Sequence, residues 1–204
     1  MKRGSIGRTV ILSVAAALAV LATLVGWLLC FPVFVVPSAS MERTVMMGDH
    51  VVVNRISTVL GRLPQRGDVV VYRHPIHIDE DYMHRIVGIP GDRLRIQDKH
   101  LYRNGVEVQE PYVQHVTTYI DSYRDNFPST PNVGLAERAQ DMLDNHVVNG
   151  KLVVPEGMYF AMGDNRDDSM DSRYTGFIPR SNVLGRPMRI YASSDPSRIG
   201  KPVN

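Results

Sequence analysis

The longest apolar run of the chain lies near its N-terminus, between Val10 and Phe31. As a helix with a rise of about 1.5 Å per residue, this run would span roughly 33 Å, enough to cross the roughly 30 Å hydrocarbon core of a bilayer. The apolar region of a cleaved signal peptide is shorter, at about 7–15 residues. The pattern therefore predicts an uncleaved transmembrane anchor over residues 10–31.

The charges that precede this run set its expected direction in the membrane. Lys2, Arg3 and Arg8 come before it, and the same segment contains no acidic residue. Because positively charged flanks stay in the cytoplasm, we expect residues 1–9 to be cytoplasmic and residues 32–204 to be extracytoplasmic. The expected location is the plasma (inner) membrane, crossed once.

Beyond the anchor, short runs rich in β-branched and aromatic residues alternate with turn signals, which is typical of a mainly β domain. The dipeptide Asn104-Gly105 suits a type I′ turn and predicts a hairpin between residues 94–96 and 106–108. Further strands are expected at residues 34–36, 51–53, 68–72, 158–162 and 183–191.

One segment departs from the strand pattern. Leu135, Ala139 and Met142 recur at helical spacing, so we expect a short helix within a peripheral insertion over residues 112–150. The last ten or so residues are polar with two prolines, which predicts a loose tail. The expected fold is thus one mainly β domain with one N-terminal transmembrane helix and a small insertion.

Charge and cysteine content narrow the function classes. The chain has 23 basic and 21 acidic residues, and three of the basic residues precede the anchor. The rest of the chain is nearly neutral and offers no basic surface for nucleic acid. The single cysteine, Cys30, lies at the end of the apolar run and cannot form an internal disulfide.

Three polar clusters interrupt the apolar pattern. Ser38 and Ser40 lie two residues apart, so in an extended segment they share a face, where one hydroxyl can attack a carbonyl and the other can bind the oxyanion. His84 lies in an apolar run and suits either a general base near neutral pH or a buried structural histidine. Residues 163–173 are dense in Asx, Ser and Arg, which is typical of a hydrated turn or of a shell that orients a base.

Taken together, the clusters resemble the three boxes of type I signal peptidases (leader peptidases of the bacterial type, peptidase family S26). Residues 37–41 and Gly48-Asp49 resemble the nucleophile box. Residues 67–70 and 84–92 resemble the base box, and residues 163–173 resemble the Gly-Asp-Asn-Arg-Asp box. Order and spacing agree over nearly the whole chain, the insertion at 112–150 excepted.

The resemblance implies the mostly β signal peptidase fold and a membrane-bound serine endopeptidase. Such an enzyme cleaves signal peptides from exported preproteins after small residues, in an Ala-x-Ala pattern. Ser40 would be the nucleophile and Ser38 an oxyanion-hole donor. Ser169 would hydrogen-bond the general base, while Asp171 and Arg173 would form a structural pair beside the site. The expected partners are exported preproteins, the lipid bilayer and the secretion translocon, and no cofactor or nucleic acid is implied.

The base position departs from the bacterial pattern, in which a lysine precedes the arginine. Here it is His84, before Arg85, as in endoplasmic-reticulum and archaeal signal peptidases. We expect His84 to be the general base, with Asp171 or Asp164 orienting its imidazole. Because an unperturbed histidine has a pKa of about 6.5, the rate should rise with pH through roughly 6 to 7. The lysines of the chain do not fill the base position: Lys2, Lys99, Lys151 and Lys201.

Two other features bear on the site. Arg43 stands where the family usually has proline, so altered substrate preference or positioning is expected without loss of the fold. His74, His77 and His84 with the acids at 79–81 have some resemblance to a zinc set, but their spacing is short and the acids fit a solvated loop, so we expect no metal.

Two alternatives to a general signal peptidase remain open at this stage. A catalytically impaired relative would keep the fold and bind signal peptides, and the substitutions at His84 and Arg43 favour it. A specialised peptidase would process one substrate, such as a pilus or conjugation precursor.

Overall fold

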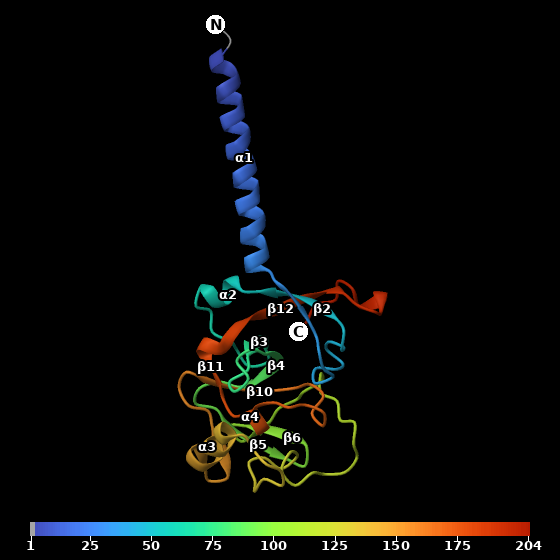
Figure 1. The fold of residues 1–204 in the computed structure, drawn as a ribbon. Coiled ribbons are helices and arrows are strands. Elements are labelled where there is room, and N and C mark those ends of the chain that lie inside the picture. The colour runs from blue at the N-terminus through green and yellow to red at the C-terminus, as the bar shows by residue number, and fades with distance from the viewer. Residues whose placement is uncertain (1–2) are drawn as a thin grey trace.

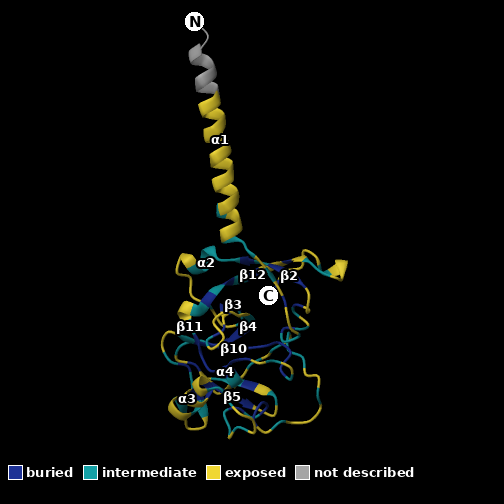
Figure 2. Cartoon of the chain, in the orientation of Figure 1, coloured by how far each residue is buried: buried dark blue, intermediate teal, exposed yellow. Residues whose placement is uncertain are grey.

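A long helix stands apart from the rest of the molecule. The computed structural model describes the backbone of residues 3–204 and the side chains of residues 10–204. Helix α1 (Arg3–Cys30) projects from the folded domain (Figure 1), and the segment Val10–Cys30 is long and apolar enough to cross a membrane. Its side chains are exposed along most of its length (Figure 2), as befits an apolar helix that lipid would cover.

The larger of two sheets carries seven strands in the order β1-β2-β12-β3-β4-β10-β11. Its pairings are antiparallel, as expected of a sheet built from short connections. The strands are β1 (Val33–Val35), β2 (His50–Asn54), β3 (Val69–Arg73), β4 (Asp81–Gly88), β10 (Met158–Met162), β11 (Ile178–Pro179) and β12 (Val183–Ala192).

The smaller sheet lies farther from α1 (Figure 1) and has the order β7-β6-β5-β9-β8. Its strands are β5 (Arg93–Gln97), β6 (His100–Arg103), β7 (Val106–Glu107), β8 (Val147–Val148) and β9 (Lys151–Val153). The short helices are α2 (Ile56–Val59), α3 (Glu137–His146), α4 (Ser172–Thr175), η1 (Arg180–Asn182) and η2 (Pro196–Arg198). The mainly β architecture with one N-terminal apolar helix is confirmed.

Valines and aromatic residues fill the core. One cluster around Val51, Val53 and Val71 lies within the larger sheet, and a second joins the smaller sheet to β10 through Leu94 and Phe160. Helix α3 joins the second cluster through its buried Ala139 and Met142. The helical spacing expected in this segment is therefore confirmed.

Two local expectations are wrong. Asn104-Gly105 does form a turn with positive φ at both residues, but it connects β6 to β7, and β5 pairs with β6 through a second such turn at Asp98-Lys99. The C-terminal residues are not a loose tail, because Val203 is buried in the core and Pro202 bridges to Arg189 of β12.

Candidate active site

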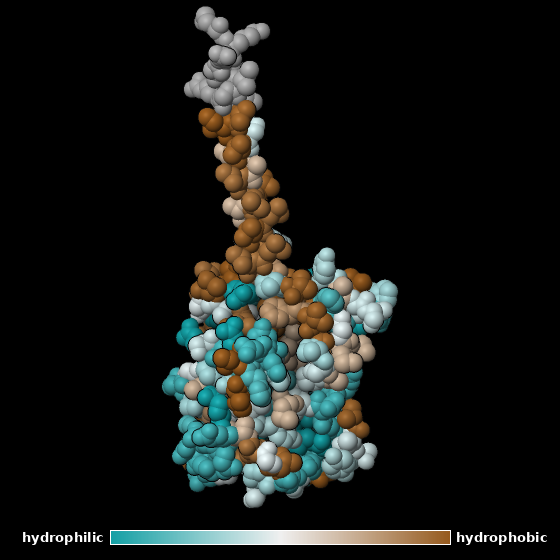
Figure 3. All heavy atoms as spheres, in the orientation of Figure 1, coloured by the Kyte–Doolittle hydropathy of each residue, from teal (hydrophilic) through white to brown (hydrophobic). Residues whose placement is uncertain are grey.

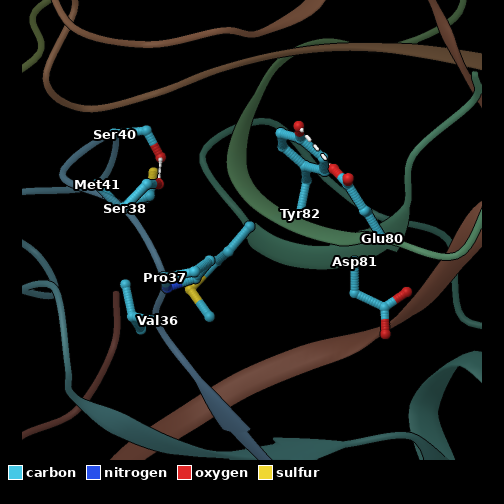
Figure 4. Close-up of a pocket in the computed structure, with 9 residues that line it drawn as sticks. Val36, Pro37, Ser38, Ser40, Met41, Glu80, Asp81 and Tyr82 are labelled. Atoms are coloured by element: carbon cyan, nitrogen blue, oxygen red, sulfur yellow. Dashed lines mark hydrogen bonds between the residues drawn. The ribbon is translucent and has the colours of Figure 1, made fainter. Parts of the chain in front are cut away.

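The turn that follows β1 carries both serines of the first polar cluster. The Ser40 and Ser38 hydroxyl oxygens lie 3.1 Å apart (Figure 4). Asn165 clamps this turn from the third cluster, since its backbone N–H donates to the Ser40 carbonyl at 3.0 Å and its side-chain amide donates to the Ala39 carbonyl at 3.2 Å. The Ser40 backbone N–H has no hydrogen-bond partner among residues 3–204, which leaves a donor beside the hydroxyl.

A cleft of about 360 Å³ opens beside these serines. Figure 4 shows Val36, Pro37 and Met41 on one side of it and Tyr82 of β4 on the other. The lining is mostly apolar, apart from Glu80 and Asp81 and the two hydroxyl groups, so it suits a small apolar side chain next to a reacting carbonyl.

His84 is buried on β4, 1% exposed, and two hydroxyl groups hold its ring. The Tyr72 hydroxyl lies 2.8 Å from Nδ1, and the Ser169 Oγ lies 3.4 Å from Nε2. The antiparallel register, in which Tyr72 faces Tyr82, explains the first contact, because it sets Tyr72 diagonal to His84 on one face of the sheet. Burial keeps the phenol protonated by raising the pKa of Tyr72 well above 10.

Burial also decides the titration of the imidazole. It lowers the pKa of His84 to about 4, although the nearby Asp171 carboxylate acts in the opposite direction. A buried imidazole is neutral over the whole physiological range, as a base must be. The pKa of the free side chain, on which the expected rise in rate between pH 6 and 7 depends, therefore does not hold in this environment, and a rate that depends on neutral His84 would rise near pH 4.

A buried ion pair lies next to the Ser169 hydroxyl that contacts His84. Arg173 binds both carboxylate oxygens of Asp171, at 2.9 and 2.8 Å, and Ser169 donates to the same carboxylate at 2.8 Å. Burial alone would raise the pKa of Asp171, but the Arg173 guanidinium outweighs it and lowers the pKa to about 2. Asp171 is therefore a permanent acceptor that fixes the Ser169 hydroxyl.

A second buried pair secures the strand next to the base. Arg85 binds Asp164 through two hydrogen bonds of 2.8 and 2.7 Å, and Thr44 of the nucleophile turn donates to the same carboxylate at 2.5 Å. These contacts tie β4, the third polar cluster and the nucleophile turn to one another. Neither Asp164 nor Asp171 hydrogen-bonds the imidazole within residues 10–204. Tyr72 and Ser169 contact it, and of the two expected carboxylates Asp171 reaches it through Ser169.

Gly163 lets the nucleophile turn and Ser169 approach each other. A methyl group at this position would lie 2.3 Å from the Ser169 Oγ and 2.5 Å from the Ser40 carbonyl oxygen. The structure thus places Ser40 and Ser169 on either side of Gly163, with Ser38 in contact with Ser40 and His84 in contact with Ser169. It does not join Ser40 to His84 by a hydrogen bond within the described chain, and the Ser40 hydroxyl instead contacts Ser38.

A sequence profile described as "Signal peptidase, peptidase S26" matches residues 8–192. The chain belongs to this family. It is a hydrolase of the serine endopeptidase class, as the resemblance carried by the three polar clusters implied.

Two relatives, compared by sequence, agree with this assignment. The signal peptidase I of Aquifex aeolicus is 31% identical over 193 residues, covering 78% of this chain and 75% of that protein. The signal peptidase I of Pseudomonas aeruginosa is 32% identical over 196 residues, covering 83% and 68%. A crystal structure of a signal peptidase I from Enterococcus faecalis is 32% identical, with a TM-score of 0.46, covering 61% of this chain and 97% of that one.

Two residues set this signal peptidase family member apart from the bacterial pattern. No lysine takes the place of His84, and Lys99 is held elsewhere, with its ammonium bound to Asp167 at 3.0 Å and to the Thr117 carbonyl at 2.8 Å. Arg43 has φ +83°, a conformation that proline cannot adopt, and its guanidinium donates to the Val113 carbonyl at 2.8 Å. The turn after Ser40 is thus built for a residue other than proline.

Tyr72 is the functional candidate that sequence reasoning missed. Its position at the end of a valine-rich strand reads as core packing, and nothing local signals its contact with His84. Only the pairing of β3 with β4 brings the two side chains together.

Proposed function

We propose that the chain removes N-terminal signal peptides from exported preproteins, cleaving after small residues in an Ala-x-Ala pattern, with Ser40 as nucleophile and His84 as general base. The observation that carries the proposal is the apolar cleft that ends at the Ser40 hydroxyl. A small side chain seated there would bring its own carbonyl carbon to the nucleophile.

The edge of β4 offers a way to hold such a substrate. Strand β4 pairs with β3 along residues 81–85, but its other neighbour, β10, pairs only from Arg85 onward. The backbone of residues 81–83 therefore has a free edge along the cleft. An extended signal-peptide segment can pair there, and alternate side chains would then enter the cleft, which matches the small-x-small pattern.

The proposed reaction has two halves. Ser40 Oγ attacks the carbonyl carbon and its proton passes to Nε2 of His84, while the Ser40 N–H and the Ser38 hydroxyl donate to the oxyanion. The C–N bond then breaks, and the leaving amine takes the proton from Nε2. Water hydrolyses the acyl ester by the same base and restores the Ser40 hydroxyl.

This sequence requires the other ring nitrogen to hold a proton. In the resting structure Ser169 gives its one proton to Asp171, so its oxygen can only accept from Nε2–H, and Nδ1 then accepts from the Tyr72 hydroxyl. For Nε2 to act as the base, the ring must change to the other tautomer, in which Nδ1–H donates to the Tyr72 oxygen 2.8 Å away. Tyr72 then has the position of the aspartate in a Ser-His-Asp triad, without its charge. The Ser40–His84 hydrogen bond forms when substrate displaces Ser40 from Ser38, in keeping with catalytic bonds that tighten only in the complex.

The surface next to α1 supports a location at the membrane. Val59, the last residue of α2, and Leu60, which follows it, are 83% and 79% exposed. Just before α2, the Arg55 N–H donates to the Cys30 carbonyl at the end of α1. Apolar side chains gather at the same end of the domain (Figure 3). We expect residues 1–9 to be cytoplasmic, residues 10–31 to be the anchor, and residues 32–204 to form the extracytoplasmic domain, which contains the insertion at 112–150. The bilayer would hold the anchor, and the secretion translocon would deliver the substrate.

A second candidate function is binding without cleavage. It is favoured by the resting contact of Ser40 with Ser38 and by the absence, within the described chain, of a hydrogen bond from Ser40 to His84. Specialised processing of a single pilus or conjugation precursor would use the same site and differ only in substrate.

The proposal is tested with the full chain in detergent micelles and a peptide that carries an Ala-x-Ala site. Mass spectrometry should show cleavage after the second alanine by the wild type and none by Ser40→Ala. Tight binding of the peptide by the wild type without cleavage, at any pH, would sink the peptidase and leave the binding function.

A further inference from the structure

We propose that a second cleft beside Ser169 receives the first residues of the mature protein, on the leaving side of the scissile bond, and that it selects against acidic residues there. This inference rests on the proposed function. The cleft has a volume of about 580 Å³ and lies between the β3–β4 loop, residues 133–136 of the insertion, and residues 167–170. We call it the leaving-side cleft.

Its position follows from the direction of proton transfer. The leaving amine must receive its proton from Nε2 of His84, so the mature side of the substrate lies on the same side as that nitrogen. Nε2 faces Ser169, and Ser169 lines the leaving-side cleft. Tyr82 lines both this cleft and the one beside Ser40, so a single extended peptide can run from one into the other past the reacting bond.

The walls of the cleft are suited to a peptide. Ile76, Val133 and Met170 are 39%, 51% and 58% exposed, so apolar surface is available on three separate segments. His74 adds a polar group: its Nδ1 accepts the His77 N–H at 2.8 Å, so the proton of a neutral ring is on Nε2. That buried Nε2 has no partner in the described part of the chain, and a substrate carbonyl can supply one after a small shift.

The charge of the cleft is set by one carboxylate. Asp167 lines the cleft too, but Lys99 binds its carboxylate at 3.0 Å and Arg124 lies at 3.3 Å. Asp168 is exposed, and its carboxylate forms no hydrogen bond or ion pair within residues 10–204. A Glu or Asp just after the scissile bond would approach this uncompensated charge, whereas a Lys would be attracted.

The test compares two peptides that share the Ala-x-Ala segment and differ only at the second residue after the scissile bond, Lys in one and Glu in the other. The wild type should show a higher kcat/KM for the Lys peptide, by about fivefold, the size expected of one partly exposed charge pair. In Asp168→Lys the preference should reverse. Val133→Lys, on another wall of the cleft, should lower the ratio of kcat/KM for the Lys peptide to kcat/KM for the Glu peptide. This second variant keeps the test valid if Asp168→Lys does not fold.

Glu156→Lys is the matched control, because Glu156 is exposed, lies outside both clefts and changes the charge by the same amount. It should leave the Lys/Glu ratio unchanged. If the variants still cleave both peptides and none of them alters the Lys/Glu ratio of kcat/KM, the proposed role of the leaving-side cleft is wrong, whereas the proposed peptidase activity stands. A third peptide, in which a methylamide replaces all residues after the scissile bond, does not need the leaving-side cleft. If the wild type cleaves neither this peptide nor the Lys and Glu peptides, the proposed function itself is wrong.

Discussion

Replacement of Gly163 by alanine tests the geometry of the site through one methyl group. Its φ is not in the left-handed region, so alanine brings no backbone strain there and acts by its volume alone. The added carbon would lie 2.3 Å from the Ser169 Oγ and 2.5 Å from the Ser40 carbonyl oxygen, whereas ordinary contacts need about 3.5 Å. Both groups must therefore retreat by about 1 Å, and a misplacement of that size typically costs about 100-fold in rate.

The expected result for Gly163→Ala is a fall in kcat of about 100-fold, with a loss of stability of about 1–3 kcal/mol from overpacking. Gly88→Ala is the control: its methyl would meet the Leu94 side chain at 2.6 Å, so it should lower stability and leave kcat within about twofold. Unfolding should be followed by circular dichroism, since the single tryptophan, Trp27, lies in α1. A folded Gly163→Ala chain with wild-type kcat would refute the arrangement of Ser40 and Ser169 around Gly163.

Three further predictions concern His84, its contact Tyr72, and Arg43 in the turn after Ser40. Because the pKa of His84 is about 4 when folded and about 6.5 when unfolded, the unfolded chain binds the proton more tightly, and stability should fall by about 3 kcal/mol as the pH drops from 6.5 to 4. Denaturant unfolding at several pH values should show a shallower loss in His84→Gln, and an equal loss in both chains would count against burial as the cause. Tyr72→Phe should lower kcat by roughly tenfold through loss of the Nδ1 partner and leave KM unchanged, whereas a rise in KM alone would point to a packing role. Arg43→Gly should be tolerated and Arg43→Pro should lower stability by more than about 1 kcal/mol, because φ is +83°; equal melting temperatures for the two would contradict that backbone conformation.

Much of the fold follows from the sequence because its signals are local. Short runs rich in β-branched and aromatic residues predict β1, β2, β3, β10 and β12, and the helical spacing over residues 135–143 predicts α3. The same local reasoning fails where the signal is not local. The turn at Asp98-Lys99 contains no glycine, so the sequence does not signal it. The pattern therefore predicts that Asn104-Gly105 connects residues 94–96 to residues 106–108, whereas it connects β6 to β7. The polar composition of the last ten residues predicts a loose tail, but Val203 is buried and fastens the tail to the core.

The candidate site, too, is predictable from the sequence only where its signals are local. The motif resemblance predicts that Ser38, Ser40 and His84 belong to one centre, and this stays a prediction: the structure joins Ser38 to Ser40 and His84 to Ser169. The partner of Nδ1 depends on the register of β3 against β4, and that register carries no signal within either strand. The pKa of His84 likewise depends on burial by segments far away in the chain, so an expectation taken from the free side chain was about two units too high.

The most direct test of a Ser40–His84 peptidase is the dependence of kcat/KM on pH, measured from pH 3.5 to 9 on the Ala-x-Ala peptide with the full chain in micelles. The account predicts a single rising limb near pH 4, full activity at neutral pH, and no activity above background in Ser40→Ala or His84→Gln. Activity that survives in His84→Gln with an unchanged pH profile would contradict it.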